Sequence, residues 1–130
     1  MTHPAKKTIN VLVVQPRKEN LASTDFTLRQ LLPECKVDFV NGLAYAFAQL
    51  GRKPYAVIIV DFAAGDTLQN ASSIIAIVTG QAPGTKLALF ADLEINPQTI
   101  GADTLVRKAD GQNALARETI RLAGHDQTAA

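Results

Sequence analysis

Cysteine, charge and long apolar runs are all scarce in this chain. It has 130 residues with one cysteine, Cys35, and a single thiol cannot form an internal disulfide. Charged residues make up 19% of the chain and the formal net charge is +1, so the sequence lacks the basic balance typical of nucleic-acid-binding domains. No run reaches the roughly 18 apolar residues that a membrane span needs. We therefore expect no disulfide scaffold, and neither nucleic acid nor membrane as a partner.

Hydrophobic residues, by contrast, are plentiful at 47%, which is enough to form the core of one domain. We predict a single domain over residues 1–130, with its core at about 9–123 and flexible termini. The first eight residues contain two lysines and no apolar signal core, so we expect no secretion signal and a cytoplasmic protein. We expect Cys35 to be buried and inert, because a free cysteine behaves as a small hydrophobe.

Short apolar runs alternate with segments of helical period along the chain. The runs predict strands, and they cover residues 11–14, 35–40, 55–60, 87–90 and 104–107. The segments between them predict five helical segments. They cover residues 21–32, the stretch between Asn41 and Gly51, residues around 74–78, a short segment at 96–101 and residues 110–123. Asn20 and Asn41 are the expected caps of the first two helices, and Phe47 is expected in the core with Tyr45 at the surface.

This alternation predicts an α/β fold, in which a parallel sheet is covered by helices on both faces. In such sheets, ligands and chemistry lie beyond the carboxyl ends of the strands. The residues just after the strands are therefore the candidates for a functional site.

Three stretches resemble the receiver domain of bacterial two-component response regulators. Residues 55–61 resemble the third strand, which ends in the phosphoaccepting aspartate, and residues 101–108 resemble the stretch that ends in a lysine. Residues 11–14 resemble the first strand. The resemblance covers about residues 10–123 and implies a flavodoxin-like (βα)5 fold, a doubly wound five-stranded parallel sheet in three α/β/α layers. It places the phosphoacceptor position on Asp61 and the phosphoryl-contact position on Lys108.

The chain departs from the receiver pattern where the family holds its metal and its phosphoryl group. The acidic pair that binds Mg²⁺ in the family falls on Gln15 and Pro16. The hydroxyl residue that contacts the phosphoryl group falls on Phe90, and the aromatic switch residue on Leu105. Transfer of a phosphoryl group to a carboxylate needs a cation, since both reactants are anionic. We therefore expect no metal cofactor, no enzymatic activity and no conventional Mg²⁺-dependent phosphorylation.

The sequence thus predicts a degenerate receiver, or pseudo-receiver, that acts in signal transduction by binding another protein. The resemblance suggests a histidine kinase, a phosphotransfer protein or a downstream regulator as the partner, and a homodimer as a further option. In the family, partners often bind the surface formed by the fourth helix, fifth strand and fifth helix. That interaction face falls here on Arg107, Leu115, Arg117 and Arg121.

Two other functions are compatible with the same residues. An active phosphorelay receiver would accept a phosphoryl group on Asp61 with Mg²⁺ as its cofactor. A binder of small anionic ligands would use the basic rim formed by Arg17, Lys18 and Lys108. A purely structural interpretation also exists, in which Asp61 and Lys108 form an ion pair at the end of a buried strand.

Overall fold

The structure is a computed structural model that describes residues 8–14, 18–62, 68–92, 94 and 96–124. Its strands are β1 (Ile9–Val14), β2 (Cys35–Val40), β3 (Val57–Asp61), β4 (Lys86–Phe90) and β5 (Thr104–Val106). Its α-helices are α1 (Lys18–Leu31), α2 (Leu43–Leu50), α3 (Leu68–Gln81) and α4 (Gly111–Leu122). Two short 3₁₀ helices complete the described elements, η1 (Pro97–Ile100) and η2 (Lys108–Asp110).

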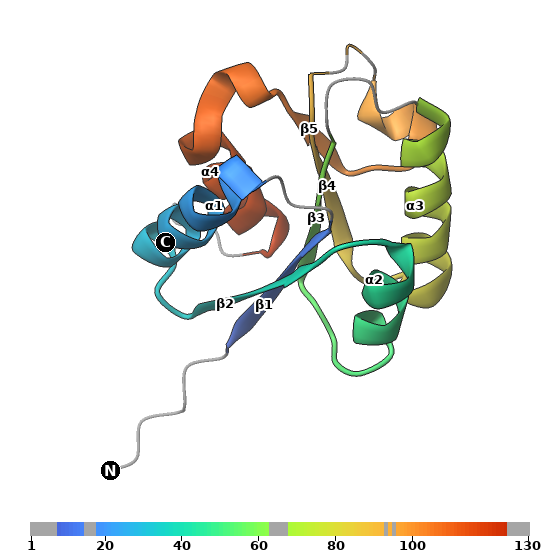
Figure 1. Cartoon of the computed structure of the whole chain (residues 1–130), viewed down its shortest axis with the longest axis horizontal. Helices are drawn as coiled ribbons and strands as arrows, with labels where there is room; N and C mark the ends of the chain where they lie inside the picture. The colour runs from blue at the N-terminus through green and yellow to red at the C-terminus, as the bar shows by residue number, and fades with distance from the viewer. Residues whose placement is uncertain (1–7, 15–17, 63–67, 93, 95, 125–130) are drawn as a thin grey trace.

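The five strands form one parallel sheet in the order β2-β1-β3-β4-β5 (Figure 1). The order places β3 at the centre and β2 at an edge, as the alternation of polar and apolar residues in β2 suggests. All strands point the same way, so their carboxyl ends meet at one edge of the sheet. This topology confirms the predicted flavodoxin-like fold, with η1 in the place of the fourth helix.

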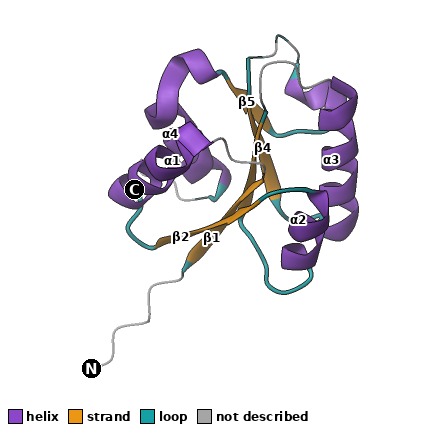
Figure 2. Ribbon diagram, in the orientation of Figure 1, coloured by secondary structure: helices purple, strands orange, loops and turns teal. Residues whose placement is uncertain are grey.

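Helices cover both faces of the sheet (Figure 2). Because side chains of a strand alternate between the two faces, each strand contributes to two separate cores. Leu12 and Ile58 belong to the core beneath α2, α3 and η1, whereas Val11 and Ile59 belong to the core beneath α1 and α4. By the same alternation, Asp61 lies on the α1 and α4 side.

The chain around η1 follows the predicted turn chemistry. The Asn96 side chain accepts a hydrogen bond from the backbone N–H of Gln98 at 3.1 Å, and Pro97 occupies the first helical position. Gly101 then ends the segment with a φ of 87°, a left-handed conformation that favours glycine. The predicted short helix is therefore confirmed.

Three details of the predicted helices are wrong. The first helix begins at Lys18, so Asn20 lies inside it and does not cap it. The second begins after Gly42, whose φ of 104° disfavours other residues, and not after Asn41. Phe47, expected in the core, is 51% exposed, because Ala46 is the residue of α2 that packs against the sheet. Within the described part of the chain, no helix has the length and apolarity needed to cross a membrane.

Candidate functional site at the carboxyl ends of the strands

The central strand β3 carries Asp61 to the carboxyl edge of the sheet. All five residues of β3 are buried, and the side chain of Asp61 is only 3% exposed. On the neighbouring strand, Asp61 pairs with Phe90, the last residue of β4. A carboxylate in such a position loses most of its hydration, so it requires a compensating cation or hydrogen-bond donors.

Lys108 provides that cation from across β4. It begins η2, which a single residue separates from the end of β5, and β4 separates β5 from β3 in the sheet. The Lys108 Nζ nevertheless lies 2.6 Å from the Asp61 Oδ1. The structural interpretation made from the sequence, an ion pair at the end of a buried strand, therefore describes the geometry of these two residues.

Phe90 forms the surface over which Lys108 reaches Asp61. Phe90 is 3% exposed, and the centroid of its ring lies 5.6 Å from the Lys108 Nζ. An ammonium group at this distance from an aromatic ring is attracted by the negative face of the ring. Phe90 thus stabilises the lysine at the position where the family has a hydroxyl group, and its side chain offers no hydrogen bond to an anion.

The structure describes only some of the other predicted site residues. Gln15, Pro16 and Arg17 lie outside the described residues, and Lys18 begins α1 without a described side chain. Leu105, at the switch position, is half-buried and packs against the core beneath α3. Among the described residues, no group of three or more His, Cys, Asp or Glu side chains is arranged to hold a metal ion.

The predicted interaction face is smaller than expected. Leu115 is 1% exposed and packs into the core under α4, because it occupies the inward side of that helix. It is therefore not available to a partner, which corrects the prediction. Arg107 is exposed, and its Nη2 lies 3.4 Å from the Glu94 Oε1. The Arg121 Nε lies 2.5 Å from the Glu118 Oε2. Arg117 is exposed as well.

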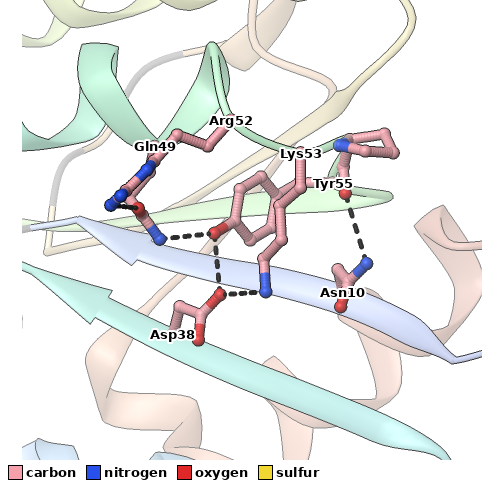
Figure 3. A network of polar contacts seen from close by, with 7 residues as sticks. Asn10, Asp38, Gln49, Arg52, Lys53 and Tyr55 are labelled. Carbon is pink, nitrogen blue, oxygen red and sulfur yellow. Dashed lines mark hydrogen bonds and ion pairs between the residues drawn. The ribbon is translucent and has the colours of Figure 1, made fainter.

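A second polar cluster was not predicted, and it links β2, α2 and the start of β3 (Figure 3). The Asp38 Oδ2 accepts a hydrogen bond of 2.7 Å from the Tyr55 hydroxyl and lies 2.6 Å from the Lys53 Nζ. Gln49, on α2, donates from its Nε2 to the same hydroxyl at 3.0 Å. These contacts hold the carboxyl end of α2 against the edge strand β2.

The titration of this cluster reflects its contacts. Burial acts to raise the pKa of Asp38, but the hydrogen bonds from Lys53 and Tyr55 outweigh it and lower the pKa below its ordinary value. Burial, then the hydrogen bond to Asp38 and its charge, raise the pKa of Tyr55 well above the usual range of a phenol. Both shifts favour the charged form of Asp38 and the neutral form of Tyr55, which are the forms that the hydrogen bond from Tyr55 to Asp38 requires.

A shallow pocket of about 590 Å³ adjoins this cluster. The loop between α2 and β3 and the loop between α3 and β4 line it, with Lys53, Tyr55, Gln81 and Thr85 among its residues. Because it includes the residues that precede β3 and β4, it lies at the amino ends of these strands. It is therefore separate from the Asp61 and Lys108 pair.

Comparison with known proteins relates the fold of this chain to that of receiver domains, and it does so through structure and not through sequence. No protein-family model matches the sequence, and no curated protein matches it. A response regulator from Thermotoga maritima matches with a TM-score of 0.75 and 19% identity, over 91% of this chain and 99% of that chain. The chemotaxis protein CheY4 of Vibrio cholerae matches with a TM-score of 0.72 and 16% identity, over 89% and 99%. The pilus assembly protein CpaE of Caulobacter crescentus matches with a TM-score of 0.71 and 15% identity, over 88% and 93%.

Proposed function

We propose that this chain, which has the fold of receiver domains, acts in signal transduction by binding another protein, without conventional Mg²⁺-dependent phosphorylation. The observation that carries the proposal is the pair of uncharged residues, Gln15 and Pro16, where receivers have an acidic pair. The contact of 2.6 Å between the Lys108 Nζ and the Asp61 Oδ1 is consistent with it, because this contact engages the carboxylate at the phosphoacceptor position.

The chemistry of phosphoryl transfer explains why these features matter. A carboxylate that attacks a phosphoryl group must approach another anion, and a divalent cation normally offsets the repulsion. Mg²⁺ is held in proteins by carboxylate oxygens and water. Gln15 and Pro16 provide no carboxylate, and Phe90 provides no hydroxyl to the transferring oxygens. Lys108 is then the one family-like contact left for the phosphoryl group, and it is engaged with Asp61.

The ion pair also suggests how such a domain would behave. In a switching receiver, the phosphoryl group competes for the lysine and changes its contacts. Here Lys108 joins the end of β5 to the end of β3 and packs over Phe90, and without a phosphoryl group to compete for the lysine this contact would persist. We therefore infer a binding module that presents a constant surface, with no catalytic activity of its own.

The exposed Arg107, Arg117 and Arg121 offer contacts to acidic groups of a protein partner, and two of them already pair with Glu94 and Glu118. A histidine kinase, a phosphotransfer protein or a downstream regulator fits this proposal. An anion site that uses Lys108 is less well supported, because the ammonium group already neutralises Asp61.

The proposal is tested by exposing the protein to Mg²⁺ with acetyl phosphate or phosphoramidate and measuring its intact mass. Asp61→Asn is the matched control, because it removes the acceptor with little change in shape. We expect no phosphoryl adduct on either protein. An adduct on the wild type that is absent from Asp61→Asn would contradict the proposal and establish an active phosphoacceptor.

A further inference from the structure

The turn between β2 and α2 consists of Asn41 and Gly42 (Figure 1). Strand β2 ends at Val40 and α2 begins at Leu43, so both residues lie outside the regular elements. Asn41 is exposed, and Gly42 has a φ of 104°. Asparagine is one of the chemically labile residues, because its side-chain amide reacts with the backbone nitrogen of the residue that follows. Glycine offers that nitrogen without a Cβ to hinder its approach.

The reaction at such a pair exchanges one amide for another and ends in hydrolysis. The backbone nitrogen of Gly42 forms a bond to the Asn41 Cγ, and its proton leaves with the side-chain nitrogen as ammonia. The product is a five-membered succinimide ring. Water then opens the ring at one of its two carbonyl carbons, which gives aspartate when the new bond to Cγ breaks and isoaspartate when the original peptide bond breaks. Water is the only co-reactant, and nothing is oxidised or reduced.

The structure leaves both reacting groups available. Within the described part of the chain, no hydrogen bond or ion pair engages the Asn41 side chain or the Gly42 N–H. The Gly42 carbonyl, by contrast, accepts a hydrogen bond from the Ala46 backbone N–H at 3.1 Å, so α2 is anchored on the far side of the reacting nitrogen. That nitrogen precedes the helix, whose first backbone N–H groups have no partner within it. Closing the ring therefore breaks no hydrogen bond among the described residues.

The other asparagines of the chain lack this combination. Four of them lie within strands or helices, where hydrogen bonds hold the backbone, and these are Asn10, Asn20, Asn70 and Asn113. Asn96 precedes Pro97, whose backbone nitrogen carries no hydrogen. Asn41 is therefore the asparagine that meets both requirements, a glycine after it and a position in a turn.

The register of the sheet gives the location of the charge that this reaction creates. Val40 pairs with Val14, and Val14 pairs with Val60. Residue 41 thus lies at the same carboxyl edge as Asp61 and two strands away from it, which corresponds to about 10 Å between their Cα atoms. Conversion of the amide to a carboxylate adds one negative charge to the edge at which the sequence lacks the acidic pair of receivers.

We propose that Asn41 is a site of spontaneous modification in the folded protein, at which the Gly42 nitrogen displaces the side-chain amide and water completes the conversion to aspartate and isoaspartate. The modified chain carries one more carboxylate at the carboxyl edge of the sheet. This proposal does not depend on whether Asp61 accepts a phosphoryl group.

The test is to keep the folded protein at mildly alkaline pH for several weeks and to digest samples for peptide mass spectrometry. Replacement of NH2 by OH raises the mass of a peptide, so the converted fraction is measured at each asparagine separately. Parallel samples in urea give the rates in the unfolded chain. Asn41→Gln is the matched control, because it keeps an exposed amide but would have to form a six-membered ring. Circular dichroism verifies that the native samples remain folded.

We expect Asn41 in the folded protein to react within about tenfold of its rate in urea, because no helix or strand has to open first. Asn113 should react at least about tenfold more slowly in the folded protein than in urea, since α4 must open locally before its backbone is released. Residue 41 of Asn41→Gln should stay unmodified over the same period.

An Asn41 that is protected by folding as strongly as Asn113, or that stays unmodified in the folded protein, would overturn the proposal. Asp61→Asn should react at residue 41 as the wild type does. This result separates the modification from the proposal about phosphorylation, which the intact-mass measurement with phosphodonors tests on its own.

Discussion

The substitution Lys108→Met tests the ion pair at the carboxyl ends of the strands. Methionine keeps a flexible apolar chain over Phe90 but removes the ammonium group that lies 2.6 Å from Asp61. Breaking a buried ion pair from one side leaves the other charge poorly compensated, at a cost of about 3–5 kcal/mol. Because Lys108 is 22% exposed, we expect the lower end of this range, about 3 kcal/mol of unfolding free energy. In a domain of this size, that corresponds to a fall in Tm of about 10 °C.

The control is a double-mutant cycle with Asp61→Asn, measured by urea unfolding followed by circular dichroism. Asparagine removes the buried charge, so the variant with both substitutions should be more stable than Lys108→Met alone. The interaction energy of the cycle should be about 1–3 kcal/mol, as found for residues in direct contact. Additive effects of the two substitutions, or a cost of Lys108→Met below about 0.5 kcal/mol, would refute the reasoning.

Three further predictions concern other residues. The pKa of Asp38 is lowered in the folded state, so the ionised carboxylate stabilises the fold above its unfolded pKa of about 4, and this stabilisation is lost as the pH falls through the folded pKa. In urea unfolding, Asp38→Asn should therefore be less stable than the wild type at pH 7, and its free energy of unfolding should fall less than that of the wild type between pH 5 and 2. Burial raises the pKa of the Cys35 thiol to about 11, so iodoacetamide at pH 8 should alkylate the native protein at least about 100-fold more slowly than the unfolded protein, and equal rates would contradict its burial. The double substitution Gln15→Asp and Pro16→Asp restores the acidic pair and should produce a Mg²⁺-dependent rise in Tm that the wild type lacks; no rise would show that the pair is not the deciding difference.

The strands and the ion pair could be predicted from the sequence because burial determines both. Residues 57–60 are apolar on both faces, which is typical of a central parallel strand, and all of them are buried. Parallel strands end at one edge of the sheet, and the resemblance to receivers assigned Asp61 and Lys108 to the ends of the third and fifth strands, so their side chains were expected to lie near one another. The geometry around Phe90 could not be predicted, since it depends on the direction that the lysine side chain takes.

The outer side of α2 and the cluster around Asp38 could not be predicted for different reasons. In α2 nearly every residue is apolar, so helical periodicity does not distinguish the inward Ala46 from the larger Phe47. Asp38 and Tyr55 are 17 residues apart, and no motif links them. Leu115 was placed on a surface because its position came from a resemblance, whereas the side of α4 that packs inwards is determined by contacts with the sheet.

The most direct test of the central claim, that Asp61 is engaged by Lys108 and does not function as a phosphoacceptor, is fluorine NMR with beryllofluoride and Mg²⁺. Beryllofluoride binds an aspartate as a phosphoryl mimic and requires the same cation and donors. We predict that the wild type gives only the signals of free fluoride species, identical to those of Asp61→Asn. A bound signal that disappears in Asp61→Asn would contradict the account and show that Asp61 can accept a phosphoryl group.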